Sequence, residues 1–117
     1  MIADMPILPN PNILSLRSKS MPRITDDEVA QISKAIGDPN RLAIYTHIAQ
    51  HDELFCGEMH AKHAISLATL SHHLKVLTEL GLITFRKEGL NVYYRSVPER
   101  MAQYVQYLTG IAGRSQR

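Results

Sequence analysis

The sequence is poor in cysteine and in large aromatic residues, and it lacks a long hydrophobic run. Cys56 is the single cysteine, tryptophan is absent and phenylalanine occurs twice in 117 residues. One cysteine per chain excludes an internal disulfide and a cysteine-rich metal cage. No apolar run approaches the roughly 20 residues that span a bilayer, and Asp4 and several prolines interrupt the start, where a secretory signal is continuously apolar. We therefore expect a single cytoplasmic domain without membrane contact.

The formal net charge of +2 is too small to indicate a nucleic-acid partner, but the charge is unevenly distributed. Residues 26–58 contain seven acidic and two basic residues, whereas residues 60–95 contain five basic and two acidic ones. Four of the six histidines also lie in the later segment. Because lysine and arginine release condensed counterions when they meet a duplex, a phosphate-facing surface is expected in that segment.

Four prolines, at positions 6, 9, 11 and 22, predict an arm over residues 1–24. The folded domain is expected at 25–112, followed by a tail at 113–117. Thr25 or Asp26 can cap a first helix that stops at Gly37. Asp38 and Pro39 then start a second helix, since aspartate caps well and a proline at the first position loses no needed hydrogen bond. The residues expected to be buried in these two helices are Val29, Ile32, Ile36, Leu42, Tyr45, Ile48 and Ala49.

Two more helices follow. Residues 56–64 predict a short third helix with Met59 and Ala64 facing inward. The fourth helix is predicted from a Ser66 cap to Leu80, with Gly81 placed to end it in a left-handed conformation. Leucines at helical spacing form its core face, and the opposite face is small, polar and partly basic. The predicted core face is Leu67, Leu70, Leu74 and Leu77, and the predicted outward face is Ala68, Thr69, Ser71, His72, Lys75 and Glu79.

After this helix the apolar period changes to that of strands. Residues 82–97 predict a β-hairpin with its turn at 88–90. Arg86 and Lys87 flank the tip on one strand, and Asn91 and Arg95 lie on the other. The hairpin therefore has basic sides.

A last helix is predicted from Pro98, with apolar residues repeating at i, i+4 and i+7. A small chain with a long apolar terminal helix more often uses part of it for a partner, and so we expect dimerisation. The residues expected at the dimer contact are Val29, Ile32, Met101, Tyr104, Val105 and Leu108.

The fold class predicted from this order is mainly α with a small β-hairpin, a winged helix-turn-helix with elements in the order α-α-α-α-β-β-α. The fourth helix would enter the major groove, where base edges need short donors and acceptors such as Thr69, Ser71 and His72. Lys75 and the hairpin would neutralise phosphates, while His73 lies at the edge of the face, where local packing is the alternative. The residues predicted to contact double-stranded DNA are Ser66, Ala68, Thr69, Ser71, His72, His73, Lys75, Arg86, Lys87 and Asn91.

The chain also resembles the ArsR family of small bacterial repressors, many of which sense metals or arsenic. The resemblance lies in residues 35–42, 66–80, 81–83, 86–89 and 92–94, which together cover about half of the chain in the family's order. It implies a dimeric repressor that is joined through its first and last helices and released from an operator by a signal. Two symmetry-related recognition helices would require an inverted repeat with half-sites about one helical turn apart.

The chain departs from the family's metal sites. The family's best known soft-metal stretch has two cysteines one residue apart, whereas here those positions hold Phe55 and Gly57 around Cys56. The family's other common site uses aspartate and histidine on the last helix, and residues 98–112 contain neither. One thiolate per chain is a poor site for a soft three-coordinate ion. We therefore expect no metal site of either kind and no cofactor, and the effector is left unknown.

The sensing mode stays open among no ligand, a thiol modification at Cys56, a metal bound by histidines and a small organic ligand in the dimer cleft. His47 and His51, and likewise His60 and His63, are spaced to share a helical face and could bind zinc or nickel, although a complete site needs three or four ligands. Cys56 could be a redox switch, but nearby Glu53 and Glu58 are expected to raise the pKa of its thiol, which favours a buried structural cysteine.

Catalysis has little support in the sequence. There is no glycine-rich phosphate loop or nucleophile motif, and the histidines lie on separate elements. We expect no enzyme and no catalytic residues. The alternative to a DNA-binding regulator is a winged-helix module that binds a protein through its hairpin or last helix.

Overall fold

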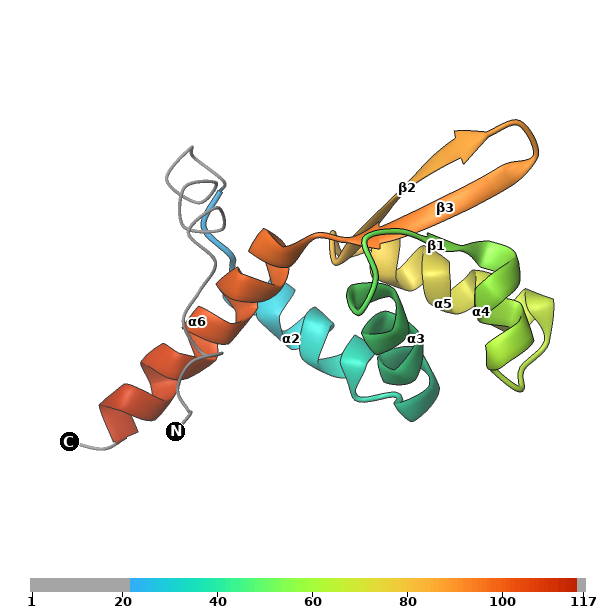
Figure 1. Ribbon diagram of the computed structural model, residues 1–117. Coiled ribbons are helices and arrows are strands. Elements are labelled where there is room, and N and C mark those ends of the chain that lie inside the picture. The colour runs from blue at the N-terminus through green and yellow to red at the C-terminus, as the bar shows by residue number, and fades with distance from the viewer. Residues whose placement is uncertain (1–21, 116–117) are drawn as a thin grey trace, which may run out of the picture. The chain divides into compact units, whose positions relative to one another are not determined.

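The computed structural model describes residues 22–115, and residues 1–21 of the predicted arm lie outside this range. Five helices and a three-stranded sheet follow one another in this part of the chain (Figure 1). They confirm the predicted winged helix-turn-helix order and add a short first strand. The elements are α2 (Asp26–Ile36), α3 (Pro39–Ala49), β1 (Leu54–Phe55), α4 (Cys56–Lys62), α5 (Leu67–Glu79), β2 (Ile83–Glu88), β3 (Asn91–Ser96) and α6 (Pro98–Ser115).

The chain divides into two compact units. One unit is Thr25–Val97, and the described part of the other contains residues 22–24 and α6. Within the second unit the side-chain amide of Gln103 donates to the carbonyl of Pro22 over 2.6 Å. Helix α6 extends through Ser115, into the segment predicted as a tail. None of the helices described between residues 22 and 115 is both long and apolar enough to cross a bilayer.

Local capping signals decide where the helices begin. Thr25 accepts from the backbone N–H of Glu28 while the Glu28 carboxylate accepts from that of Thr25, a reciprocal pair that closes the start of α2. Asp38 caps α3 by accepting from two backbone N–H groups, and Ser66 caps α5. Gly81 ends α5 with a φ of 78°, which favours glycine because a Cβ is strained there. The four predicted boundary signals are confirmed.

The core of the larger unit lies between the three main helices and the base of the hairpin. Burying each large aliphatic side chain stabilises the fold by about 1.5–3 kcal/mol. The largest completely buried side chains are Ile32, Ile44, Ile48, Met59, Leu70, Leu77, Leu82 and Ile83.

Some predicted core positions are wrong. In α3 the buried face is formed by Ile44, Tyr45 and Ile48, while Leu42 is 44% exposed and Ala49 is also exposed. Ala64 is exposed after the end of α4, and in α2 the third buried residue is Ala35 rather than Ile36. In short helices one residue of shift rotates the apolar face, and the tertiary contacts choose among neighbouring apolar positions.

The core face of α5 also differs from the leucine pattern. Its buried residues are Leu70, His73, Leu74 and Leu77, which follow the i, i+3, i+4, i+7 spacing. Leu67 is 54% exposed, because it is the first residue of the helix and lies one turn beyond the core. A histidine therefore takes a core-facing position in the fourth predicted helix.

His73 is accommodated in the core by Arg41. The Nε of Arg41 donates to Nδ1 of His73 over 3.2 Å, and its Nη1 donates to the carbonyl of Ala35 over the same distance. A guanidinium can only donate, so Nδ1 accepts and the imidazole is neutral with its proton on Nε2. Burial, followed by the charge of Arg41, lowers the pKa of His73, and the carboxylate of Asp38 opposes this only in part.

The sheet has the order β1-β3-β2 with antiparallel pairing throughout. The hairpin register pairs Ile83 with Ser96 at its base and Glu88 with Asn91 at its tip, which leaves a two-residue loop. Gly89 opens this loop with a φ of 63°, as tight hairpin turns require. Strand β1 was not predicted, because two residues are too few to show an alternating pattern.

We expect the free energy of unfolding to fall as the pH is lowered from about 7.5 to about 5. The folded pKa of His73 lies below the unfolded value, so the unfolded chain binds more protons and stability is lost below about pH 6.5. H73Q, which keeps an acceptor for Arg41, should show a shallower pH dependence in urea titrations. It should not be flat, because burial also lowers the pKa values of His47 and His63. Equal slopes for both proteins would contradict this role of His73.

Candidate nucleic-acid interface

The face of α5 opposite its buried residues is exposed and hydrophilic. The hydroxyl of Ser66 accepts from the backbone N–H of Thr69 over 3.1 Å and donates to its Oγ1 over 2.9 Å, which fixes both side chains at the start of the helix. Thr69 keeps its own hydroxyl hydrogen for another acceptor. This face consists of Ser66, Ala68, Thr69, Ser71, His72 and Lys75, all of them exposed.

His73 does not belong to this face. Its side chain is 5% exposed and bonded to Arg41, so the prediction of a DNA contact at this position is wrong. The alternative that the sequence left open, local packing, is what the structure has. Its neighbour His72 points away from the core and is exposed.

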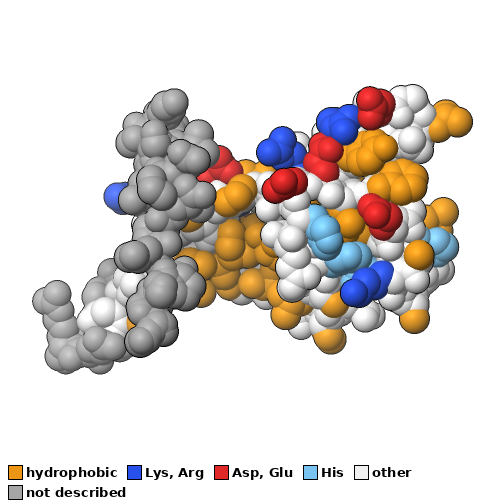
Figure 2. All heavy atoms as spheres, viewed as in Figure 1, with side chains coloured by type: hydrophobic (Ala, Val, Ile, Leu, Met, Phe, Trp, Pro, Cys, Tyr) orange, Lys and Arg blue, Asp and Glu red, His pale blue; other side chains and the backbone are white. Residues whose placement is uncertain are grey.

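The hairpin β2–β3 projects from the unit as a wing (Figure 1). Lys87, Asn91 and Arg95 are exposed along it, and Leu90 in its loop is fully exposed. Glu88 is an acidic residue close to the tip, and Figure 2 shows acidic and basic side chains near one another in this region of the molecule. The wing is thus less uniformly basic than its sequence suggested.

Arg86 is the reason for this difference. Its Nε and Nη2 donate to the two carboxylate oxygens of Glu53 over 2.6 and 2.9 Å, and its Nη1 donates to Glu88 over 3.3 Å. The guanidinium also lies 4.6 Å from the centre of the Tyr93 ring. Hydrogen bonding from Arg86 lowers the pKa of the Glu53 carboxyl group. The hydrogen bonds to Glu53 and Glu88 in turn raise the pKa of Arg86. Arg86 is therefore neutralised by protein carboxylates, which the sequence reading did not anticipate.

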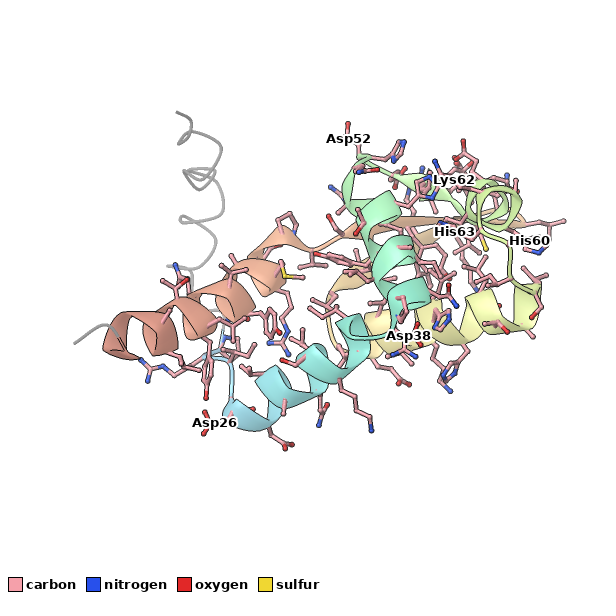
Figure 3. The ribbon with its side chains drawn as sticks, turned by 90° about the horizontal axis from the view of Figure 1, so that it is seen from below. Asp26, Asp38, Asp52, His60, Lys62 and His63 are labelled. Carbon is pink, nitrogen blue, oxygen red and sulfur yellow. The ribbon has the colours of Figure 1, made fainter. Side chains whose placement is uncertain are left out.

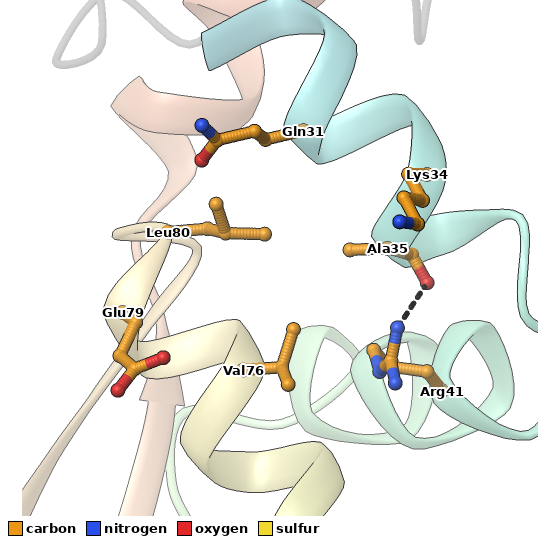
Figure 4. A pocket seen from close by; sticks show the side chains of 7 residues that line it. All are labelled: Gln31, Lys34, Ala35, Arg41, Val76, Glu79 and Leu80. Carbon is orange, nitrogen blue, oxygen red and sulfur yellow. Dashed lines mark hydrogen bonds between the residues drawn. The ribbon is translucent and has the colours of Figure 1, made fainter.

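A hollow of about 370 Å³ lies beside the C-terminal end of α5. In Figure 4 the apolar side chains of Val76 on α5 and of Leu80 directly after it point into the hollow, while Lys34 and Gln31 come from α2. Arg41 borders it and carries the hydrogen bond to the Ala35 carbonyl (Figure 4). The hollow is open to solvent. The charged residues that line it, Lys34, Arg41 and Glu79, do not form a catalytic set of acid, base and nucleophile in contact.

Known proteins share this arrangement. Residues 36–85 match the family described as a helix-turn-helix domain. The biofilm growth-associated repressor of Agrobacterium fabrum is 36% identical over 84 residues, which are 72% of this chain and 71% of that protein. The cadmium resistance transcriptional regulatory protein CadC homolog of Staphylococcus aureus is 37% identical over 79 residues, 68% of this chain but only 65% of its own length.

A solved structure agrees with these relatives. It is the homodimeric winged helix-turn-helix DNA-binding domain of a Mycobacterium bovis protein described as a possible ArsR-family transcriptional regulator. It is 26% identical, with a TM-score of 0.59 over 79% of this chain and 91% of its own. The chain belongs to the ArsR family of helix-turn-helix transcriptional regulators. The resemblance drawn from the sequence is thereby confirmed, and members of this family are regulators and not enzymes.

The soft-metal stretch of the family is altered in this member at α4. Cys56 is half-buried, and a Cβ added to Gly57 would lie 2.6 Å from the ring of Phe55. A cysteine at position 57 would therefore require the phenylalanine ring to move. The pKa of the Cys56 thiol is raised, as predicted, but the cause is burial rather than Glu53 or Glu58.

The residues predicted for the dimer contact differ in their exposure. Val29 and Ile32 are 6% and 0% exposed and Tyr104 is 7% exposed, so these three are buried. Met101 is half-buried. The exposed apolar residues of α6, here called the α6 stripe, are Val105, Leu108 and Ile111, at 50%, 41% and 45%.

The histidines are brought together differently from the predicted pairs. His47 contacts both His51 and His63, whereas His60 is exposed on the other side of α4 (Figure 3). Among residues 22–115, no group of three histidine, cysteine, aspartate or glutamate side chains is arranged to hold a metal ion.

The Arg86–Glu53 pair gives a direct test of the wing in this regulator. We expect E53Q to bind duplex DNA more tightly at low salt, because the amide leaves Arg86 free for a phosphate. The slope of log K against log salt should steepen by up to about 0.9, the value for one added phosphate contact. Fluorescence anisotropy with random duplex measures both quantities.

Two variants serve as comparisons. E88Q removes the longer of the two ion pairs and should have a smaller effect of the same sign. D27N makes the same charge change on α2, away from Arg86, and should leave the slope unchanged. Weaker binding by E53Q would mean that Glu53 holds the wing in its DNA-binding shape instead of competing with phosphate.

Proposed function

We propose that this regulator is a homodimeric repressor that binds an inverted-repeat operator, with α5 in the major groove and the hairpin β2–β3 beside it. The exposed hydrophilic face of α5 carries the proposal. A groove about 12 Å wide admits one helix, and its base edges are read by short donors and acceptors. Thr69, Ser71 and His72 supply such groups from a single turn of a helix whose opposite face is buried in the core.

The contacts to phosphate are assigned to the cations beside this face. Lys75 lies on α5 itself, and Lys87 is an exposed cation on the wing. Ser66 and Asn91 would add neutral hydrogen bonds to the backbone of the duplex, and Ala68 would allow its close approach. Arg86 contributes once a phosphate replaces Glu53.

A homodimer is proposed through the α6 stripe. Val105, Leu108 and Ile111 are large apolar side chains exposed along one helix, an arrangement that a second copy could cover. The Mycobacterium bovis neighbour is named as a homodimeric domain. Repression is the role stated in the name of the Agrobacterium relative. Two such recognition helices would require half-sites about 34–36 Å apart.

Base contacts and phosphate contacts should respond differently to mutation. With an operator recovered from random DNA, we expect T69A or H72A to weaken binding by about 1–3 kcal/mol and to relax preference at one base pair. K87A should weaken all sequences alike and reduce the salt slope by about 1. Titrations with operator and scrambled duplex distinguish the two patterns, and the reverse pattern would mean that the contacts are assigned wrongly.

A single charge in the α6 stripe should dissociate the dimer. We expect L108E to sediment as a monomer and to lose about 10²–10⁴ in affinity for the two-half-site operator, because each half-site then binds alone. Q106E places the same charge on an exposed position outside the stripe and should remain dimeric. An L108E protein that stays dimeric would exclude this face as the dimer contact.

The alternative, a module that binds a protein, is favoured by the exposed apolar side chains of the wing, Phe85 at 47% and the fully exposed Leu90 at its tip. A gel shift with random duplex at low salt separates the two functions. If the chain shows no binding even there, where non-specific binding is strongest, the DNA-binding proposal fails.

A further inference from the structure

A hollow of about 440 Å³ lies beside α3, and no part of the proposed function uses it. Most of its lining comes from one face of α3 at helical spacing, between Pro39 and Gln50, and the end of α4 completes it. The residues assigned to DNA and those of the α6 stripe are not among the residues that line it. The hollow is therefore separate from both proposed contact surfaces.

The part of the hollow near the start of α3 is apolar and open to solvent. It is lined by Pro39, Leu42 and Ala43, all three of them exposed, with Leu42 at 44%. The core uses the face of α3 that carries Ile44 and Ile48 instead. Covering exposed apolar surface with an apolar ligand is favourable, because it removes that surface from water.

The other end of the hollow is polar and basic. His47 borders it from α3, and Lys62 and His63 border it from the end of α4, on the side away from His60 (Figure 3). None of the described residues that line the hollow is acidic. Within residues 22–115 the ammonium group of Lys62 forms no ion pair. This end is therefore complementary to an anion.

The two histidines at this end form a pair that can accept one proton. Nδ1 of His47 lies 3.1 Å from Nε2 of His63, so one ring donates to the other. A proton added to the pair makes this bond charge-assisted, since an imidazolium ring then donates to a neutral one. The outer nitrogen of the protonated ring carries a hydrogen as well, which it can donate to an anion.

The surroundings keep the pair neutral until an anion arrives. Burial, followed by the charges of His63, Lys62 and His51, lowers the pKa of His47, while Glu58 raises it. Burial, followed by Lys62, lowers the pKa of His63. A carboxylate against the pair acts in the opposite direction to Lys62, because a nearby negative charge favours the imidazolium form. Anion binding should thus be coupled to the uptake of one proton from solvent.

We propose that this hollow binds a small monocarboxylate with an extended apolar chain, such as a medium-chain fatty acid. Its chain would cover Leu42, and its carboxylate would lie between Lys62 and the His47–His63 pair. Between Leu42 and His47 α3 rises by about 7.5 Å, which suits an elongated ligand. A dicarboxylate would place its second charge on the apolar end. Binding does not depend on the proposed function, because the residues assigned to DNA lie elsewhere.

The test is a calorimetric titration of the full chain with sodium octanoate at about pH 6.5 and about pH 8, each in two buffers of different ionisation enthalpy. We expect one octanoate per chain and the uptake of up to one proton. The affinity should then rise toward lower pH, by at most about tenfold per pH unit. 1-Octanol, which has the chain without the charge, should bind at least about threefold more weakly. Acetate, which has the charge without the chain, should not saturate.

The apolar end has a variant with a matched control. L42N should weaken octanoate binding by about fourfold, the effect of losing contact with about one methylene group. Because Leu42 is not part of the core, the fold should tolerate this change. L90N makes the same substitution at the fully exposed tip of the wing and should bind octanoate as the wild type does.

The basic end has two such pairs. K62Q should weaken octanoate binding by at least about twofold, whereas K34Q, which makes the same charge change on α2, should not. H63N, which keeps a polar side chain, should reduce the proton uptake, whereas H60N should retain it, since His60 lies on the other side of α4. Thermal unfolding without octanoate checks that each variant is folded.

The imidazole NMR resonances of the wild type decide the site without any variant. Those of His47 and His63 should move as octanoate is added, and those of His60 should not. A chain that shows no saturable octanoate binding would overturn the proposal. So would equal affinity for 1-octanol, or binding that moves the His60 resonances but not those of His47 and His63.

Discussion

Arg41 joins the three helices on which the DNA-facing surface depends. Its guanidinium donates to the last turn of α2 at Ala35 and to His73 in the middle of α5, and its own backbone N–H is bound by the Asp38 cap of α3. One residue thus contacts the end of one helix, the start of the next and the buried face of the third. Because α5 is held from its buried face, its opposite face is left exposed to solvent.

The wing is organised by a different principle. Its strands are aligned by backbone pairing, whereas its charge is set by Glu53, which lies outside the hairpin just before β1. The same side chain that orders Arg86 also places a negative charge against its guanidinium. Electrostatic attraction to a duplex therefore depends on a competition between a protein carboxylate and a phosphate, so that it is not a fixed property of the basic residues.

The sequence predicted what is determined locally. The caps at Thr25, Asp38 and Ser66, the positive φ at Gly81 and the tight hairpin loop each follow from one residue type at one position, and each is confirmed. The exposed face of α5 was also predicted, since it needs only helical periodicity.

The contacts that the sequence did not predict join residues that are far apart in the chain. Arg86 and Glu53 are 33 residues apart, Arg41 and His73 are 32 apart, and His47 and His63 are 16 apart. No periodicity marks such pairs. His73 shows the physical reason most clearly. A histidine is expected to be exposed because it is polar, but here an arginine from another helix donates to its ring nitrogen, and this hydrogen bond permits its burial. Strand β1 was not predicted for a related reason, because it is defined only by its pairing with β3.

The burial of His73 has a consequence for engineering new operator preferences in this scaffold. In a library that randomises the whole stretch from Ala68 to Lys75, most variants would be destabilised. Positions 70, 73 and 74 are buried, so changes there disrupt core packing rather than alter DNA recognition. Diversity confined to Ala68, Thr69, Ser71, His72 and Lys75 would vary the readout alone, and the retained Ser66 would keep the helix start intact.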